Sequence, residues 1–293
     1  MKKVIFKGCG TAIATPFDEN GVNYKVFKDM IEHQIKEGVD SIIVCGTTGE
    51  ASTMTEAERK ETIKFVVDIV NKRIPVIAGT GSNNTQAAIE MTKYAESVGA
   101  DGALVVTPYY NKTTQKGLIE HYKIIASNTL LPIIMYSVPS RTGVNILPET
   151  CLELSKIDNI VAIKEASGNI SQVAKIASLC GDNLSIYSGN DDQIIPVLSV
   201  GGIGVISVLS NIEPKFTHQM VYDYFNGNIE EAKRKQLSSL NLIENLFSEV
   251  NPIPVKAGLN IIGYNYGIPR LPLIEMSEDK KSNLKKAIEE FGK

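Results

Sequence analysis

A lysine closes a short apolar stretch of the sequence. Residues 160–164 read Ile-Val-Ala-Ile-Lys, and a turn of small residues follows at 166–168. An apolar run of this kind predicts a strand buried on both faces, as in parallel sheets. Lysine is rarely buried without a partner, so Lys164 needs an explanation. It is either an amine kept from water, which can form a Schiff base with a carbonyl substrate, or a strand-end lysine whose stem covers apolar surface while its ammonium reaches water.

Two hydroxyl groups and two glycines follow another apolar run, in the turn Gly46-Thr47-Thr48-Gly49-Glu50. Backbone N–H groups and hydroxyl donors in such a turn can hold a carboxylate. The same composition is also typical of a simple Ser/Thr turn with no ligand. Both interpretations of this turn stay open on its residues alone.

A tyrosine and an arginine stand near the end of a third run. Tyr136 ends residues 132–136, and Arg141 lies in the loop that follows. A phenol beside an amine can carry protons, and an arginine can bind a carboxylate through two parallel hydrogen bonds. The alternatives are a packing residue at the rim of a sheet and a surface arginine. Tyr109 and Tyr110 follow a fourth run, and at most one of two adjacent loop residues is expected to face a site.

The elements that must position these side chains alternate along the chain. Strands are predicted at 8–15, 41–45, 75–79, 102–106, 132–136, 160–164, 184–188 and 204–208. Helices are predicted at 24–36, from about 55, at 84–99, 114–127, 148–155, 191–200 and 214–225, with Asp191 and Asp192 as caps of the helix at 191–200. Eight alternating units favour an α/β fold, a closed (β/α)8 TIM barrel. In such a barrel the active site lies at the C-terminal ends of the strands.

The pattern changes near residue 227, after which no strand is predicted. One long helix is expected at 228–250, a second at 253–262 and a third at 277–291. The sequence therefore predicts a catalytic barrel at 1–226 and a C-terminal helical domain at 227–293. The first strand is followed by no Gly-x-Gly-x-x-Gly turn, which counts against a dinucleotide-binding fold.

Composition argues against several classes of function. The 293 residues carry a net charge of −3, so no basic field invites nucleic acid or an anionic membrane. No apolar stretch reaches the roughly 18 residues of a membrane span, and no export signal is evident, so a cytoplasmic protein is expected. The four cysteines are scattered and the three histidines are not at ligand spacing. Buried thiols are therefore expected, without a metal site.

Four motifs together resemble the dihydrodipicolinate synthase family, within the pyruvate-dependent class I aldolases and lyases related to N-acetylneuraminate lyase. They are GTTGE at 46–50, VTPYYN at 106–111, MYSVPSRTG at 135–143 and IKEASG at 163–168. The resemblance covers nearly the whole chain. It implies a lyase that condenses pyruvate with L-aspartate 4-semialdehyde to give 4-hydroxy-tetrahydrodipicolinate, on the route to diaminopimelate and lysine. It also implies a homotetramer, a dimer of dimers, with no metal or organic cofactor.

The resemblance also assigns roles to individual residues. Lys164 resembles the Schiff-base lysine, and Tyr136 resembles the proton donor and acceptor. Thr47 and Tyr110 resemble its partners in a proton relay, with Tyr110 reaching in from a neighbouring subunit. The expected substrate contacts are Thr48 and Ile206 for pyruvate and Arg141 for the aldehyde.

Some positions depart from the family pattern. Ser137 stands where the family commonly has Asn, next to the site, and activity is expected to survive this change. In lysine-inhibited relatives a carboxylate on the helix after the third strand pairs with the effector's ammonium, but Ala87 stands there in this chain. Glu56 and Arg59 occupy positions that are often histidines in those relatives. The resemblance therefore implies weak or absent inhibition by lysine.

Two other functions stay open from the sequence. The first is a different lyase of the same group, acting on N-acetylneuraminate or a 2-keto-3-deoxy sugar acid, with the same lysine and tyrosine. Arg141 favours the small semialdehyde over a sugar. The second is a non-catalytic barrel that binds a keto acid as a sensor, because a fold alone does not determine function.

Overall fold

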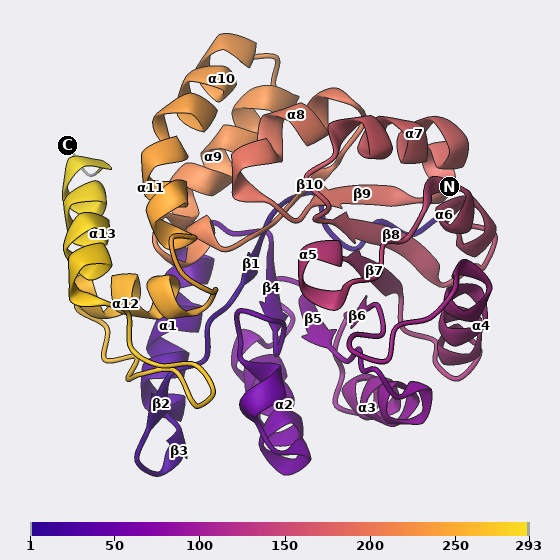
Figure 1. Cartoon of the computed structure of the whole chain (residues 1–293), viewed down its shortest axis with the longest axis horizontal. Helices are drawn as coiled ribbons and strands as arrows, with labels where there is room; N and C mark the ends of the chain where they lie inside the picture. Colours follow the sequence, from indigo (N-terminus) through magenta and orange to yellow (C-terminus); the bar gives the residue numbers. More distant parts are fainter. Residues whose placement is uncertain (1, 292–293) are drawn as a thin grey trace.

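Eight parallel strands close into a barrel at the centre of the protein (Figure 1). The structure is a computed structural model that describes residues 2–291. The barrel strands are β1 (Gly8–Ala12), β4 (Ser41–Val44), β5 (Val76–Gly79), β6 (Gly102–Val106), β7 (Ile133–Ser137), β8 (Ile160–Glu165), β9 (Ser185–Ser188) and β10 (Gly204–Ser207). They pair in the order β1, β10, β9, β8, β7, β6, β5, β4, and β4 pairs with β1. The predicted α/β fold, a (β/α)8 barrel followed by helices, is confirmed.

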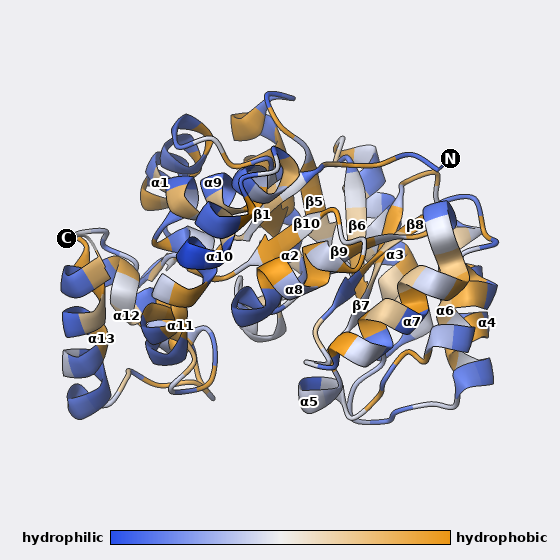
Figure 2. Cartoon of the chain, turned by 90° about the horizontal axis from the view of Figure 1, so that it is seen from above, coloured by the Kyte–Doolittle hydropathy of each residue, from blue (hydrophilic) through white to orange (hydrophobic). Residues whose placement is uncertain are grey.

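Helices surround this barrel, because each connection between parallel strands must return to the other end of the sheet. They are α1 (Tyr24–Lys36), α2 (Glu56–Val70), α3 (Thr85–Ser97), α4 (Gln115–Ala126), α6 (Pro148–Leu154), α7 (Ile170–Cys180), α8 (Ile194–Ser199) and α9 (Pro214–Phe225). Figure 2 shows apolar residues along the barrel strands and hydrophilic residues on the side of α13 (Glu278–Phe291) that faces away from the rest of the protein.

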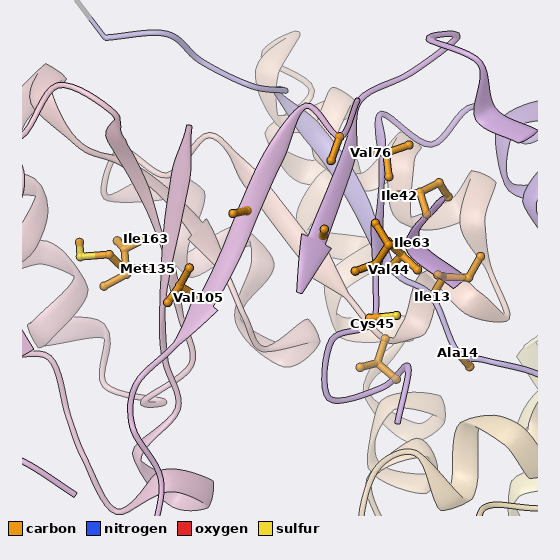
Figure 3. Close-up of a cluster of buried hydrophobic side chains, with 14 of the residues drawn as sticks. Ile13, Ala14, Ile42, Val44, Cys45, Ile63, Val76, Val105, Met135 and Ile163 are labelled. Carbon is orange, nitrogen blue, oxygen red and sulfur yellow. The ribbon is translucent and has the colours of Figure 1, made fainter. Parts of the chain in front are cut away.

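Side chains alternate between the inside of the barrel and the helix layer, as the two-residue period of a strand requires. Ile134 and Tyr136 of β7 belong to the cluster inside the barrel. Met135, between them, packs in the outer cluster with Ile163 of β8, and Figure 3 shows these two side chains together beside Val105. The register between β7 and β8 shifts between Ile133 and Ile134, after which Tyr136 lies opposite Lys164.

The C-terminal segment contains α10 (Ile229–Ser238), α11 (Leu240–Leu246), α12 (Ile253–Ile261) and α13. The prediction of one long helix at 228–250 is therefore wrong, because the helix is interrupted at Ser239. The Ser239 hydroxyl donates to the Gln236 carbonyl at 2.9 Å, the group that a continuing helix would offer to the N–H of Leu240. Serine competes with helical hydrogen bonds in this way. The predicted domain division at residues 226 and 227 stays a prediction.

Two helices and two short strands were not predicted from the sequence. They are the helix α7, the one-turn helix α5 (Pro139–Thr142) and a short antiparallel pair of β2 (Phe17–Asp18) with β3 (Gly21–Val22). The signal for α7 was present, because Asn169 caps it by accepting from the N–H of Gln172 at 3.1 Å. No helix among residues 2–291 is long and apolar enough to cross a membrane. All four cysteines are buried and free, which confirms the expectation of buried thiols.

A buried histidine lies between α3 and α4. His121 is 6% exposed, and its Nδ1 is hydrogen-bonded to the Thr85 hydroxyl at 2.9 Å. Its Nε2 has no partner among the described residues. Burial lowers the pKa of His121 to about 4, because an imidazolium at this position would lose its hydration without gaining a counter-charge.

We therefore expect His121 to make the fold less stable as the pH falls from 6.5 toward 4. In that window the unfolded chain binds a proton that the folded chain does not, which costs about 1.4 kcal/mol per pH unit. Between pH 7 and pH 5 the loss from this one group is roughly 2 kcal/mol. Urea denaturation of wild type and His121→Gln at both pH values measures it. An equal loss of stability in the two proteins would contradict the prediction.

Candidate active site

A cavity of about 280 Å³ opens at the C-terminal ends of the strands. Its lining includes Thr47 after β4, Tyr109 after β6, Tyr136 on β7 and Arg141 on α5. These residues are distant in sequence, and the barrel brings them together because parallel strands all end at the same rim. The cavity therefore lies where the sequence predicted the active site.

The lysine and the tyrosine predicted to carry the chemistry lie side by side. Lys164 on β8 is directly opposite Tyr136 on β7 in the strand register. The Nζ of Lys164 is 4.4 Å from the centroid of the Tyr136 ring, and the two residues are 5% and 6% exposed. Lys164 forms no ion pair with any described residue. Its amine is thus buried, uncommitted and next to a phenol.

A glycine on the next strand connection leaves space for this lysine. A Cβ added at Gly189 would lie 3.2 Å from Lys164 Cε and 2.6 Å from Ala166 Cβ. The second distance is shorter than real carbon contacts, so a side chain at Gly189 would force the Lys164 stem or its neighbours to move. The close approach explains why the turn after β9 carries a glycine.

The turn between β4 and α2 presents its two threonines differently. Thr47 lines the cavity, whereas Thr48 is only 2% exposed. The Thr48 hydroxyl accepts from Asn251 Nδ2 at 3.0 Å. Cys45 and Glu50, at the two ends of the turn, have positive φ of 54° and 55°. The turn is therefore tightly folded, with one threonine on the cavity and one tied to the C-terminal segment.

The remaining predicted residues lie outside the cavity lining, and so does Lys164 itself, whereas its neighbour Tyr136 is part of it. Tyr110 is 92% exposed and has a positive φ of 70°. Tyr109, beside it, is the tyrosine that faces the cavity, in line with the expectation that at most one would. Ile206 on β10 is fully buried in the cluster inside the barrel, with Tyr187 and Tyr136. Neither Ile206 nor Thr48 lines the cavity.

A buried carboxylate near the lysine was misread from the sequence. Asp191 was expected to cap the following helix, but its Oδ2 accepts from the N–H groups of Val208 and Leu209 at 3.0 and 2.9 Å. Its Oδ1 has no hydrogen-bond partner among residues 2–291. Burial raises the pKa of Asp191, which the charge of Lys164 partly opposes. The sequence pattern indicated a cap of the next helix, which is a local contact. The contact of Asp191 with the loop after β10 is long-range, so the pattern did not reveal it.

A network of polar side chains lies next to Tyr136 and Lys164, on the helix side of the sheet. Ser137 Oγ donates to Asn145 Oδ1 at 3.2 Å, and Asn145 Nδ2 donates to Gln172 Oε1 at 2.7 Å. Gln172 Nε2 in turn donates to Glu165 Oε1 at 2.8 Å. Ser137 and Glu165 directly follow Tyr136 and Lys164, so the network ties together the two strand ends. Ser137 contacts this network and is not part of the cavity lining, and the survival of activity with serine here stays a prediction.

A smaller cavity of about 130 Å³ adjoins the site between α2 and α3. Its lining includes Glu56, Arg59, Ala87 and Glu90, and Arg59 also lines the larger cavity. Arg59 Nη2 donates to the Gly79 carbonyl at 2.9 Å. The three residues singled out for lysine sensitivity thus do share one cavity. Among residues 2–291 no cluster of three His, Cys, Asp or Glu side chains could hold a metal ion.

Comparison with known proteins gives a consistent result. The family model described as the dihydrodipicolinate synthetase family matches residues 5–291. The 4-hydroxy-tetrahydrodipicolinate synthase of Caldicellulosiruptor saccharolyticus is 60% identical over 98% of each chain. That of Clostridium novyi is 57% identical, over 99% of this chain and 98% of its own. The solved dihydrodipicolinate synthase of Thermotoga maritima superposes with a TM-score of 0.97, at 43% identity and with 99% of each chain covered.

A closed parallel barrel with a buried lysine beside a tyrosine at neighbouring strand ends defines a lyase of the Schiff-base-forming class. Within that class, the chain belongs to the dihydrodipicolinate synthetase family. The family and the enzyme class predicted from the four motifs are thereby confirmed. The roles of the individual site residues stay predictions.

Proposed function

We propose that this enzyme condenses pyruvate with L-aspartate 4-semialdehyde to give 4-hydroxy-tetrahydrodipicolinate. The observation that carries the proposal is the buried amine of Lys164, 4.4 Å from the ring of Tyr136 and free of any ion pair among the described residues. The names of the close relatives support the same reaction. A lysine with this placement can do the work for which other enzymes use an organic cofactor.

The proposed reaction begins when the Lys164 amine attacks the ketone carbon of pyruvate. Water leaves, and the resulting iminium is an electron sink that allows the pyruvate methyl group to lose a proton. The enamine carbon then forms a bond to the aldehyde carbon of the second substrate, whose oxygen takes up a proton. Finally the amino group of that substrate attacks the iminium carbon, which closes the ring and releases Lys164. Tyr136 moves the protons, with Thr47 and Tyr110 as its relay partners.

Substrate recognition is assigned to three further residues. Thr48 and Ile206 are proposed to contact pyruvate, and Arg141 the carboxylate of the aldehyde. The position of Arg141 supports its role, because it lines the cavity on the exposed turn α5. A guanidinium there can form two parallel hydrogen bonds with a carboxylate.

The decisive test is borohydride reduction in the presence of pyruvate. We expect a permanent mass gain on Lys164 of the wild-type enzyme, and none in Lys164→Ala, because alanine has no amine to form the Schiff base. Intact-mass and peptide mass spectrometry measure the adduct, and circular dichroism checks the fold. Trapping on another lysine in the variant would show that Lys164 is not the nucleophile.

Tyr136→Phe is the matched control for this experiment, since it keeps the amine and the buried ring. It should still form the adduct, whereas turnover with both substrates should fall by roughly 10²–10⁴-fold. Wild-type turnover in this variant would remove Tyr136 from the mechanism. Failure of wild-type enzyme to trap pyruvate would refute the proposed function itself.

We also propose that the enzyme is a homotetramer, a dimer of dimers, in which Tyr110 serves the site of a neighbouring subunit. The exposure of Tyr110 supports this, because an aromatic ring 92% exposed in one chain is accessible to a neighbouring subunit. Sedimentation should give the mass of four chains.

Complementation between two variants of low activity tests whether Tyr110 serves the site of a neighbouring subunit. Lys164→Ala and Tyr110→Phe should each have low activity, but their co-expression should restore activity, because one site in each hybrid dimer then has both intact groups. If Tyr110 served its own chain, every site in the hybrid would lack one group and no activity would return. Full activity of a monomer at micromolar concentration would equally contradict the proposal.

Weak or absent inhibition by lysine is the last part of the proposed function. Ala87 offers no carboxylate at its place in the small cavity. Of the two carboxylates that do line it, Glu56 is paired with Lys60 Nζ at 2.5 Å and Glu90 accepts from Gln86 Nε2 at 3.0 Å. A charge-assisted hydrogen bond is worth roughly 1.5–3 kcal/mol, or one to two decades in affinity. The measurement is a lysine titration at saturating pyruvate, with Ala87→Glu for comparison. Half-inhibition of the unmodified enzyme below millimolar lysine would contradict this prediction.

A further inference from the structure

A fully buried ion pair joins the C-terminal segment to the turn that carries Thr47 and Thr48. Lys256 Nζ on α12 donates to Glu50 Oε1 at 2.8 Å, and the two side chains are 1% and 0% exposed. Glu50 ends the turn after β4, and Lys256 lies 206 residues later in the chain. It is the only ion pair within the described residues that has both partners so fully buried.

Both members of the pair form a further hydrogen bond with the C-terminal segment. Glu50 Oε2 accepts from the N–H of Arg270 at 3.0 Å, and Lys256 donates a second hydrogen bond to the Ile268 carbonyl at 3.1 Å. The Phe17 ring lies 4.3 Å from the ammonium. Burial lowers the pKa of Lys256, and the neighbouring Glu50 carboxylate opposes that shift. The pair is therefore a fixed junction, without a free charge that could serve a ligand.

A second contact from the same segment reaches the site more directly. Asn251, between α11 and α12, donates from Nδ2 to the Thr48 hydroxyl at 3.0 Å. The Asn251 carbonyl accepts from Arg141 Nη2 at 3.5 Å. One 5%-exposed residue thus contacts a residue proposed to bind pyruvate and a residue proposed to bind the aldehyde.

Stability alone does not explain such a junction. A buried ion pair is often no more stabilising than apolar residues of the same size, because removing two charges from water is costly. It does, however, restrict the backbone to one arrangement. Glu50 has the left-handed φ of 55° that closes the turn, and the two threonines stand only two and three residues before it. The pair is therefore suited to fix where the threonine hydroxyls lie.

We propose that Glu50, Lys256 and Asn251 are positioning residues, through which the C-terminal segment sets the geometry of the pyruvate-binding turn. The proposal rests on the proposed function, because it assigns the turn to pyruvate. It makes the C-terminal helices part of the active-site architecture. Losing these contacts should weaken pyruvate binding and Schiff-base formation more than the steps that follow.

The test compares two variants by steady-state kinetics and by the pyruvate dependence of borohydride trapping. Asn251→Ala removes the Thr48 contact and leaves the ion pair intact, so its melting temperature should stay close to that of wild type. Its pyruvate KM and the pyruvate concentration for half-maximal trapping should rise roughly tenfold, as expected for about 1.4 kcal/mol. Its kcat should change much less. Lys256→Met should show the same shift in pyruvate together with a lower melting temperature, because Glu50 loses its counter-charge.

The matched control is Glu58→Gln. Glu58 pairs with Arg270 Nη2 at 2.7 Å and so joins the same C-terminal segment to α2. It reaches the threonine turn only through Arg270, whose backbone N–H donates to Glu50 Oε2, and the substitution does not remove that hydrogen bond. Glutamine also preserves the capping box at Thr55. This variant should keep the wild-type pyruvate KM.

The possible outcomes separate the inference from the function on which it rests. A wild-type pyruvate KM in folded Asn251→Ala would overturn the inference, and so would a shift of equal size in Glu58→Gln. If Lys256→Met does not fold, the pyruvate KM values of Asn251→Ala and Glu58→Gln still test the inference. Absence of pyruvate trapping in wild-type enzyme would instead refute the proposed function.

Discussion

The shift of register between β7 and β8 is the constraint on which the site depends. Ile133 lies opposite Ile160, but Ile134 lies opposite Ala162, so one residue of β8 is passed over. Without that shift Tyr136 would lie opposite Ile163 and not Lys164. Neighbouring residues in register point to the same side of a sheet, and a one-residue slip exchanges the two faces. The amine would then point into the helix layer, where Ile163 now packs. A local irregularity in one strand pair thus places the lysine on the same side as the tyrosine, as bulges near active sites commonly do.

Polar groups that follow the strands then hold that arrangement in place. Ser137 and Glu165 end β7 and β8 on the helix side and join through Asn145 and Gln172. Asp191 connects the turn after β9 to the loop after β10. Each buried polar group would be costly if left without partners, so these hydrogen bonds oppose any separation of the strand ends. The cluster inside the barrel is otherwise largely apolar, and its other tyrosine, Tyr187, donates to the Phe6 carbonyl and not to the amine.

Much of this could be predicted from the sequence, because its signals are local. The strand that carries Lys164 was predicted to within one residue at its end. The prediction came from the apolar run before Lys164 and the small residues after it. The positions of Tyr136, Thr47 and Arg141 on the rim followed from the barrel once the alternation of elements was recognised. The break at Ser239 was missed, because it depends on a choice between two hydrogen bonds that the apolar periodicity does not reveal. Asn251 and Lys256 were missed for a different reason, since nothing near them in sequence indicates contact with a turn some 200 residues earlier.

The difference between local sequence signals and long-range contacts also matters for the division of the chain into domains. Composition and element type change near residue 227, which suggests a separate helical domain. The contacts indicate closer integration, because α12 and the loops around it supply partners to Glu50, Thr48 and Arg141. A segment that could fold and function by itself would not need a buried charge from the barrel to satisfy one of its own lysines. Lys256 without Glu50 would be a buried cation, and Glu50 without Lys256 a buried anion, so neither part is electrostatically complete alone. The boundary at residues 226 and 227 therefore stays a prediction, and residues from both sides of it meet at the turn after β4.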